Sequence, residues 1–86
     1  MNDAPPLTKR SNVLLVDDDI ELVGMFRDYL ERDGFNVTCC HDGLTGAEAA
    51  LTGLHDIAVL DVMMPGLNGF QALTKIRASS PIPLIM

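Results

Sequence analysis

Two short apolar runs, each ending at aspartate, constrain the fold of this chain more than any other feature. Val13–Val16 leads directly into Asp17 and Asp18. Ile57–Leu60 leads in the same way into Asp61. Unbroken runs of branched apolar residues are typical of strands buried on both faces, as in a parallel sheet. Because a carboxylate at the end of such a strand is costly to bury without a partner, the repeated pattern predicts an acidic pocket at the carboxyl edge of the sheet.

Periodicity and turn residues divide the rest of the chain into alternating elements. Strands are predicted at 12–16, 35–40, 57–60 and 83–86, and helices at 20–33, 44–52 and 70–78. The order βαβαβαβ with short links predicts an α/β fold, a doubly wound parallel sheet with helices on both faces. Residues 1–11 are polar and include Pro5 and Pro6, which predicts a flexible N-terminal tail in front of a single domain at 12–86.

The predicted helices have apolar sides and recognisable ends. The apolar side of the first helix consists of Leu22, Val23, Phe26, Tyr29 and Leu30. The apolar side of the third consists of Phe70, Leu73 and Ile76. Asp18 or Asp19 can cap the first helix, and Gly34 can supply its left-handed stop. For Asp19 and Asp42, capping is the predicted role.

Composition excludes several classes of partner. The chain has 12 acidic and 6 basic residues, a formal net charge of −6, which argues against this segment binding nucleic acid or an anionic membrane surface. With 48% hydrophobic residues a globular core is expected. No apolar run is long enough to cross a membrane. The N-terminus lacks the apolar stretch of a secretory signal, so we expect a cytoplasmic protein.

The cysteines and histidines give no sign of a metal or redox site. Cys39 and Cys40 are neighbours in a predicted strand, so their side chains point to opposite faces and cannot easily form a disulfide with each other. We expect small, half-buried thiols. His41 and His55 lie in predicted turns without ligand spacing, and no site is assigned to them.

Several of these segments resemble the receiver domain of bacterial two-component response regulators. The matching segments are 14–18, 34–35, 42–43, 60–65, Gly69 and 76–77, and the resemblance runs from about residue 12 to residue 86. Within the family, the chain looks most like receivers attached to winged-helix transcription factors. The resemblance implies the flavodoxin-like strand order 2-1-3-4-5, with the last third of the fold lying beyond Met86.

The resemblance also implies a function, which is phosphorelay signalling and not enzymatic turnover. Asp61 would accept a phosphoryl group from a sensor histidine kinase, and Asp18 and Asp61 would hold Mg²⁺ through their side chains. Asp17 would act through a coordinated water and Met63 through its backbone carbonyl. The chemistry agrees, because Mg²⁺ prefers hard oxygen ligands. Two carboxylates about 5 Å apart repel by roughly 3 kcal/mol at an effective dielectric constant near 20. Transcription would be regulated through a DNA-binding region beyond this segment.

The chain departs from the family pattern at its C-terminal end. Receivers add a Ser or Thr after strand four and a Lys after strand five, and both positions fall beyond Met86. The first helix would then lack a neighbour, and strand four would be an exposed edge. We therefore expect a chain of these 86 residues to be marginally stable, with a homodimer, a domain swap or aggregation as outcomes.

Other functions for the aspartates fit less well. Capping or loop entry explains each one singly, but not why both strands end in aspartate. A Mg²⁺-dependent phosphohydrolase of the haloacid dehalogenase type needs a second acid where this chain has Met63. A calcium loop starting at Asp17 would need Gly and Glu where Leu22 and Asp28 stand. A non-functional receiver fragment, binding Mg²⁺ poorly, stays open as the alternative for the 86 residues alone.

Overall fold

A computed structural model describes residues 11–86 of the chain. Residues 1–10, which belong to the predicted tail, lie outside the described residues. Ser11, the last residue of that predicted tail, is buried. Its carbonyl oxygen accepts a hydrogen bond from the Asn36 N–H at 3.0 Å.

The predicted order of strands and helices is confirmed. The elements are β1 (Asn12–Val16), α1 (Ile20–Arg32), β2 (Asn36–Cys40), α2 (Gly43–Ala50), β3 (Ile57–Leu60), α3 (Gly69–Arg77) and β4 (Leu84–Ile85). The first and third strands have the predicted bounds, and the other elements differ from prediction by one or two residues at their ends. No helix in residues 11–86 is long and apolar enough to cross a membrane.

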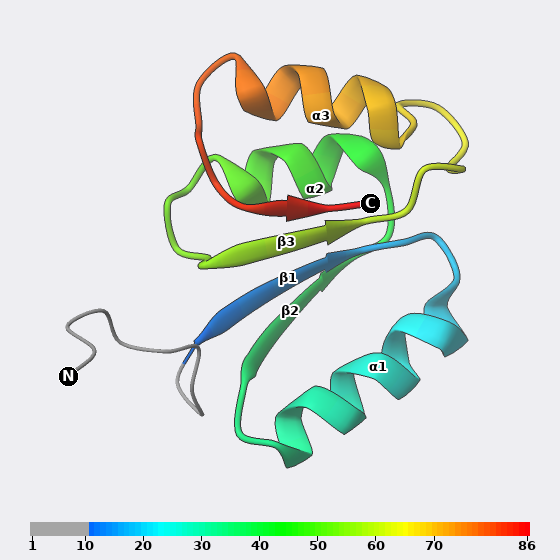
Figure 1. Ribbon diagram of the computed structural model, residues 1–86. Helices are drawn as coiled ribbons and strands as arrows, with labels where there is room; N and C mark the ends of the chain where they lie inside the picture. The colour runs from blue at the N-terminus through cyan, green and yellow to red at the C-terminus, as the bar shows by residue number, and fades with distance from the viewer. Residues whose placement is uncertain (1–10) are drawn as a thin grey trace, which may run out of the picture.

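The four strands form one parallel sheet in the order β2-β1-β3-β4 (Figure 1). The chain steps outward from β1 to β2 and then back past β1 to β3. Because parallel crossovers share one hand, this reversal puts α1 on the opposite face from α2 and α3. The result is a doubly wound parallel sheet whose order agrees, as far as β4, with the flavodoxin-like order that the resemblance implies. Val16 is in register with both Cys40 and Leu60, so the three strands end side by side.

Alternate residues of the central strands pack toward the two faces. Leu14 and Val16 of β1 lie in the larger core cluster, with the buried residues of α2 and α3. Val13 and Leu15 lie in a smaller cluster on the other face, where Val23 of α1 joins them. The larger core thus lies between the sheet and two helices, and the smaller one under α1 alone.

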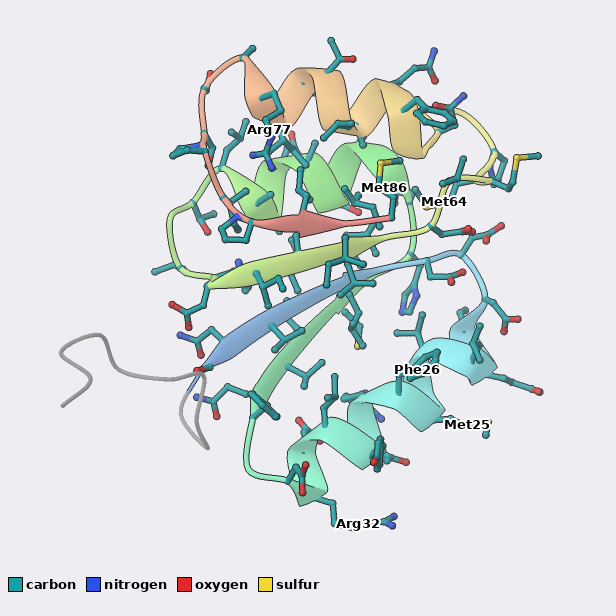
Figure 2. The ribbon with its side chains drawn as sticks, viewed as in Figure 1. Met25, Phe26, Arg32, Met64, Arg77 and Met86 are labelled. Atoms are coloured by element: carbon teal, nitrogen blue, oxygen red, sulfur yellow. The ribbon has the colours of Figure 1, made fainter. Side chains whose placement is uncertain are left out.

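The apolar side of α1 is only partly covered. Val23 is 3% exposed, as predicted, but Leu22, Phe26 and Tyr29 are 40%, 52% and 64% exposed. Figure 2 shows Phe26 on the side of α1 nearer the sheet and Met25 on its outer side. A single helix cannot cover a four-stranded face, so these side chains meet no second helix among the described residues.

One predicted core position in α3 is wrong. Phe70 is 61% exposed, whereas Ala72 and Ile76 are fully buried. Residues four apart share one face of a helix, so the Ala72 and Ile76 pair defines the side that packs toward α2. Phe70 lies in the first turn, on a different side of the helix.

Candidate functional site

Three aspartates meet at the carboxyl edge of the sheet. Asp17 and Asp18 follow β1, and Asp61 follows β3. One carboxylate oxygen from each lies within 4.8 Å of the others. Hydrogen bonding between β1 and β3 brings these aspartates together. The Asp61 N–H donates to the Val16 carbonyl oxygen at 2.8 Å, so the ends of the two strands lie side by side. The predicted acidic pocket is therefore present.

Backbone hydrogen bonds orient two of the carboxylates. Asp17 Oδ1 accepts the Asp19 N–H at 2.9 Å, and Asp61 Oδ1 accepts the Met63 N–H at 3.2 Å. Asp19 lies outside the cluster, and its Oδ1 accepts the Leu22 N–H at 3.0 Å as the cap of α1. The predicted capping role of Asp19 is confirmed.

Asp42 is likewise a helix cap, as predicted. Its Oδ1 accepts the Thr45 N–H at 2.8 Å at the start of α2. This bond lowers the pKa of Asp42 below its ordinary value.

The electrostatics of the cluster are unfavourable for its charged form. Burial is the largest cause that raises the pKa of Asp17, and the charges of Asp61, Asp18 and Asp19 raise it further. The hydrogen bond from the Asp19 N–H opposes the shift. Asp17 and Asp61 are half-buried and Asp18 is exposed. A bound cation would relieve both the repulsion and the burial of charge.

Glycines bring two helix ends against the loop after β3. A Cβ at Gly69 would meet the carbonyl oxygen of Asp61 and lie 2.7 Å from the Val62 Cα. A Cβ at Gly43 would meet the carbonyl oxygen of Leu67. The first turn of α3 therefore rests directly on the backbone of Asp61 and Val62, and the first turn of α2 rests on the backbone of Leu67. The sequence showed Gly69 and Gly43 only within segments that match the family, and it did not indicate these contacts.

Met63, the fourth predicted ligand, lies in the loop beyond Asp61. Its side chain is 80% exposed, and its N–H is the donor to the Asp61 carboxylate. This bond fixes the Met63 main chain beside Asp61. The role of its carbonyl as a ligand stays a prediction. The alternative phosphohydrolase would require an acid or base at this position, and a methionine side chain offers neither.

His41 lies beside the cluster, although the sequence gave it no role. Its Nδ1 is 3.1 Å from the carbonyl oxygen of Asp17. The contact follows from the register of the sheet, in which Cys40 pairs with Val16, so the next residues of the two strands are neighbours. His55 precedes β3 at the opposite edge of the sheet. Its Nδ1 is buried without a hydrogen-bond partner among the described residues.

The two cysteines point to opposite faces of β2, as predicted. Cys39 packs with the cluster under α1 and Cys40 with the larger core. Both are half-buried free thiols, and burial raises the pKa of each. These groups are therefore in the protonated, unreactive form at neutral pH.

Comparison with known proteins identifies the kind of domain. The family model described as the response regulator receiver domain matches residues 13–86. The transcriptional regulatory protein CseB of Streptomyces avermitilis is 45% identical over 80 residues, covering 93% of this chain and 34% of that protein. CpxR of Escherichia coli K12 is 44% identical over 79 residues, covering 88% of this chain and 32% of that protein. The chain thus spans about a third of the length of these relatives.

Solved structures agree with the sequence comparison. The receiver domain of the hybrid histidine kinase CckA aligns with a TM-score of 0.79 at 27% identity, over 88% of this chain and 72% of that one. The receiver domain of the sensor histidine kinase PA1611 of Pseudomonas aeruginosa PAO1, which has a magnesium ion coordinated in its active-site cleft, aligns with a TM-score of 0.81 at 27% identity. That alignment covers 86% of this chain and 63% of the PA1611 domain. The chain belongs to the response regulator receiver domain family, a non-enzymatic signalling module whose relatives here are transcriptional regulators.

Proposed function

We propose that this chain is the phosphate-accepting part of a response regulator, and that Asp61 takes the phosphoryl group from a sensor histidine kinase. The observation that carries the proposal is the meeting of three carboxylates at the edge of the sheet, with Asp61 half-buried among them. A carboxylate is a competent nucleophile toward phosphorus and forms a covalent acyl phosphate.

The donor set fits Mg²⁺. Oxygen ligands in small number are what this ion prefers, since it keeps several waters of its own. We assign Asp18 and Asp61 as side-chain ligands, Asp17 as a ligand through water, and the Met63 carbonyl as the fourth protein contact. When bound, the ion would neutralise charge on the carboxylates and on incoming phosphate oxygens. The magnesium ion in the related PA1611 domain supports this assignment.

The protein's own contribution to the transfer is to place Asp61. Its N–H is held by the Val16 carbonyl, and the Met63 N–H orients its carboxylate. An Asp61 oxygen forms a bond to phosphorus while the bond from phosphorus to the kinase histidine nitrogen breaks. The electron pair of that bond stays on the imidazole, and the product is aspartyl phosphate. Such transfers depend mainly on positioning and electrostatics.

The wider role follows from the relatives. CseB and CpxR are transcriptional regulatory proteins of which this chain matches about a third. We propose that phosphorylation here regulates transcription in the cytoplasm through a DNA-binding region outside this segment. The net charge of −6 argues against DNA contact by the segment itself.

Phosphoryl labelling tests the assignment of Asp61. The chain is incubated with Mg²⁺ and acetyl phosphate, and intact mass is measured. The wild type should gain one phosphoryl group, and Asp61→Asn should gain none because its amide is not a nucleophile. Asp19→Asn is the matched control, since Asp19 is a neighbouring aspartate outside the cluster, and it should be labelled like the wild type. Equal labelling of Asp61→Asn and wild type would remove Asp61 from the proposed role.

A further inference from the structure

The end of β2 reaches the acidic site through His41. Cys40, the last residue of β2, accepts the Asp17 N–H on its carbonyl oxygen at 3.0 Å. The next residue, His41, lies with Nδ1 3.1 Å from the carbonyl oxygen of the same Asp17. Asp17 is therefore held on both its N–H and its C=O by two consecutive residues of one neighbouring strand end.

The chemistry of this contact fixes its direction. A carbonyl oxygen can only accept a hydrogen bond, so the hydrogen lies on Nδ1 of His41. In the neutral ring, the second nitrogen is then the acceptor. His41 itself is not part of the carboxylate cluster. It acts on the site through the backbone of Asp17.

The Asp17 carbonyl belongs to the peptide that joins Asp17 to Asp18. Because a peptide unit is planar, a bond to this oxygen orients the whole unit and both attached Cα atoms. Two of the three clustered carboxylates are carried by those Cα atoms. The Asp19 N–H is held in turn by Asp17 Oδ1 at 2.9 Å, so the segment from Asp17 to Asp19 is tied at successive backbone groups.

We propose that His41 is a positioning residue of the acidic site: its Nδ1–H fixes the Asp17–Asp18 peptide and thereby presents both carboxylates to a divalent cation. The inference rests on the proposed function, because it names a residue that prepares the proposed Mg²⁺ site. His41 is exposed, so the bond is a modest one.

Asn and Leu side chains have the same shape, so substituting each of them for His41 separates the effect of losing the hydrogen bond from the effect of losing the ring. In Asn, the side-chain nitrogen is bonded to Cγ, as Nδ1 is in His, so His41→Asn keeps a donor at that place. His41→Leu has the same branching without a donor. Loss of the bond should weaken Mg²⁺ binding about three- to tenfold in His41→Leu, equivalent to roughly 0.7–1.4 kcal/mol. His41→Asn should stay within about twofold of the wild type.

The Mg²⁺ dissociation constants of the three proteins are measured by isothermal titration calorimetry, with thermal melts without Mg²⁺ to show that each is folded. The amide ¹⁵N shift of Asp18 is recorded in metal-free samples as the local readout. It should move in His41→Leu and be restored in His41→Asn. Wild-type affinity in His41→Leu, or equal weakening in both variants, would overturn the proposal.

The two proposals fail in different ways. If Asp61→Asn is labelled like the wild type, the phosphoacceptor assignment fails, and the Mg²⁺ affinities still decide the role of His41. If the wild type binds no Mg²⁺, the proposed site fails together with the part of this inference that concerns the cation. An Asp18 amide shift that is the same in wild type and His41→Leu would show that His41 does not fix the peptide.

Discussion

The three clustered aspartates differ in how much water reaches them. Asp18 is exposed, whereas Asp17 and Asp61 are half-buried at the ends of their strands. Burial and like charges together disfavour the ionised form of Asp17, which is the expected state of a cation site without its cation. The site is thus built at some cost to the stability of the metal-free fold.

Replacing Asp17 by Asn should stabilise the metal-free protein at neutral pH. Burial raises the pKa of Asp17 in the folded state above its ordinary value of 3.8. Between pH 3.8 and that raised pKa, the folded state therefore binds more protons than the unfolded state. Its contribution is therefore fully favourable below pH 3.8 and is lost as the pH rises through the folded pKa. Asn keeps an oxygen for the Asp19 N–H. We expect a gain at pH 7 of a few tenths to about 1 kcal/mol in unfolding free energy.

Urea unfolding without Mg²⁺ checks this expectation. The gain in unfolding free energy from Asp17→Asn should disappear near pH 3, because the Asp17 side chain is then neutral in both the folded and the unfolded state. Glu48→Gln, which removes one exposed acidic charge from α2, is the control for the change in net charge. Added Mg²⁺ should stabilise Asp17→Asn less than the wild type. A variant less stable than the wild type at pH 7 would contradict the electrostatic account.

The sequence revealed some residues of the site better than others. Asp17, Asp18 and Asp61 could be predicted because each follows an apolar run and parallel strands end at one edge. His41 could not, because a residue in a turn carries no periodicity and its contact depends on which strand neighbours β1. Phe70 was misplaced because a short helix with few apolar residues fits more than one face.

At the scale of elements, end signals and close contacts position the helices. Asp19 and Asp42 cap α1 and α2, and Gly34 ends α1 with a φ of 94°. The start of α3 is fixed by a capping box formed by Asn68 and Gln71. Asn68 Oδ1 accepts the Gln71 N–H, and the Gln71 side chain accepts the Asn68 N–H, both at 2.9 Å. Such boxes depend on short-range pairing that periodicity does not reveal.

Gly69→Ala should disturb the site through the backbone. The added methyl would meet the Asp61 carbonyl oxygen and the Val62 Cα, and neither backbone atom can rotate away. We expect a loss of about 1–3 kcal/mol in unfolding free energy, as for overpacked cores. Labelling of Asp61 by acetyl phosphate should also slow, because the carboxylate is displaced. Chemical unfolding and labelling time courses measure the two effects.

Gly24→Ala is the control for this prediction. Apart from its chain neighbours and the nearby backbone of α1 itself, a Cβ at Gly24 would have no heavy atom of the described residues within 4 Å. Because Ala is a better helix former, Gly24→Ala should gain up to about 1 kcal/mol and be labelled normally. If Gly69→Ala were as stable as Gly24→Ala, the close packing of α3 on the Asp61 backbone would not hold in solution.

For the whole molecule, the two faces of the sheet are unequally covered. The face under α2 and α3 has a continuous buried core, whereas the face under α1 has a hollow of about 100 Å³ that reaches Asp17 and Asp61. Beside it, α1 presents an apolar groove of about 230 Å³ lined by Leu22, Met25, Phe26 and Tyr29. Apolar groups grouped in this way favour association.

A polypeptide of these 86 residues should therefore self-associate. Met25→Lys together with Tyr29→Lys should shift it toward monomer, since both side chains line the groove. Leu44→Lys with Leu54→Lys is the control, because it replaces two exposed apolar residues outside α1. Sedimentation over a range of concentrations measures the shift. A monomeric wild type with a sharp melt above about 60 °C would contradict the expectation, since that is high for a mesophilic domain.

The arrangement of strands and helices could be predicted from the sequence better than the extent to which the helices cover the sheet. Alternating apolar runs and helical segments determine the fold class, and crossover handedness determines which face each helix takes. The exposure of α1 depends on which elements lie across the sheet from one another, so periodicity within α1 could not show it. The helix pattern indicated a buried side, and the structure covers only Val23 fully.

Locating the phosphoryl group tests the central claim most directly. The chain is labelled with acetyl phosphate and Mg²⁺ and then reduced with borohydride, which converts an aspartyl phosphate to homoserine. Peptide mass spectrometry then shows which position has changed. The account predicts homoserine at position 61 alone, and none in a sample reduced without phosphodonor. Homoserine at Asp17 or Asp18, or no converted residue in a protein that binds Mg²⁺, would contradict it.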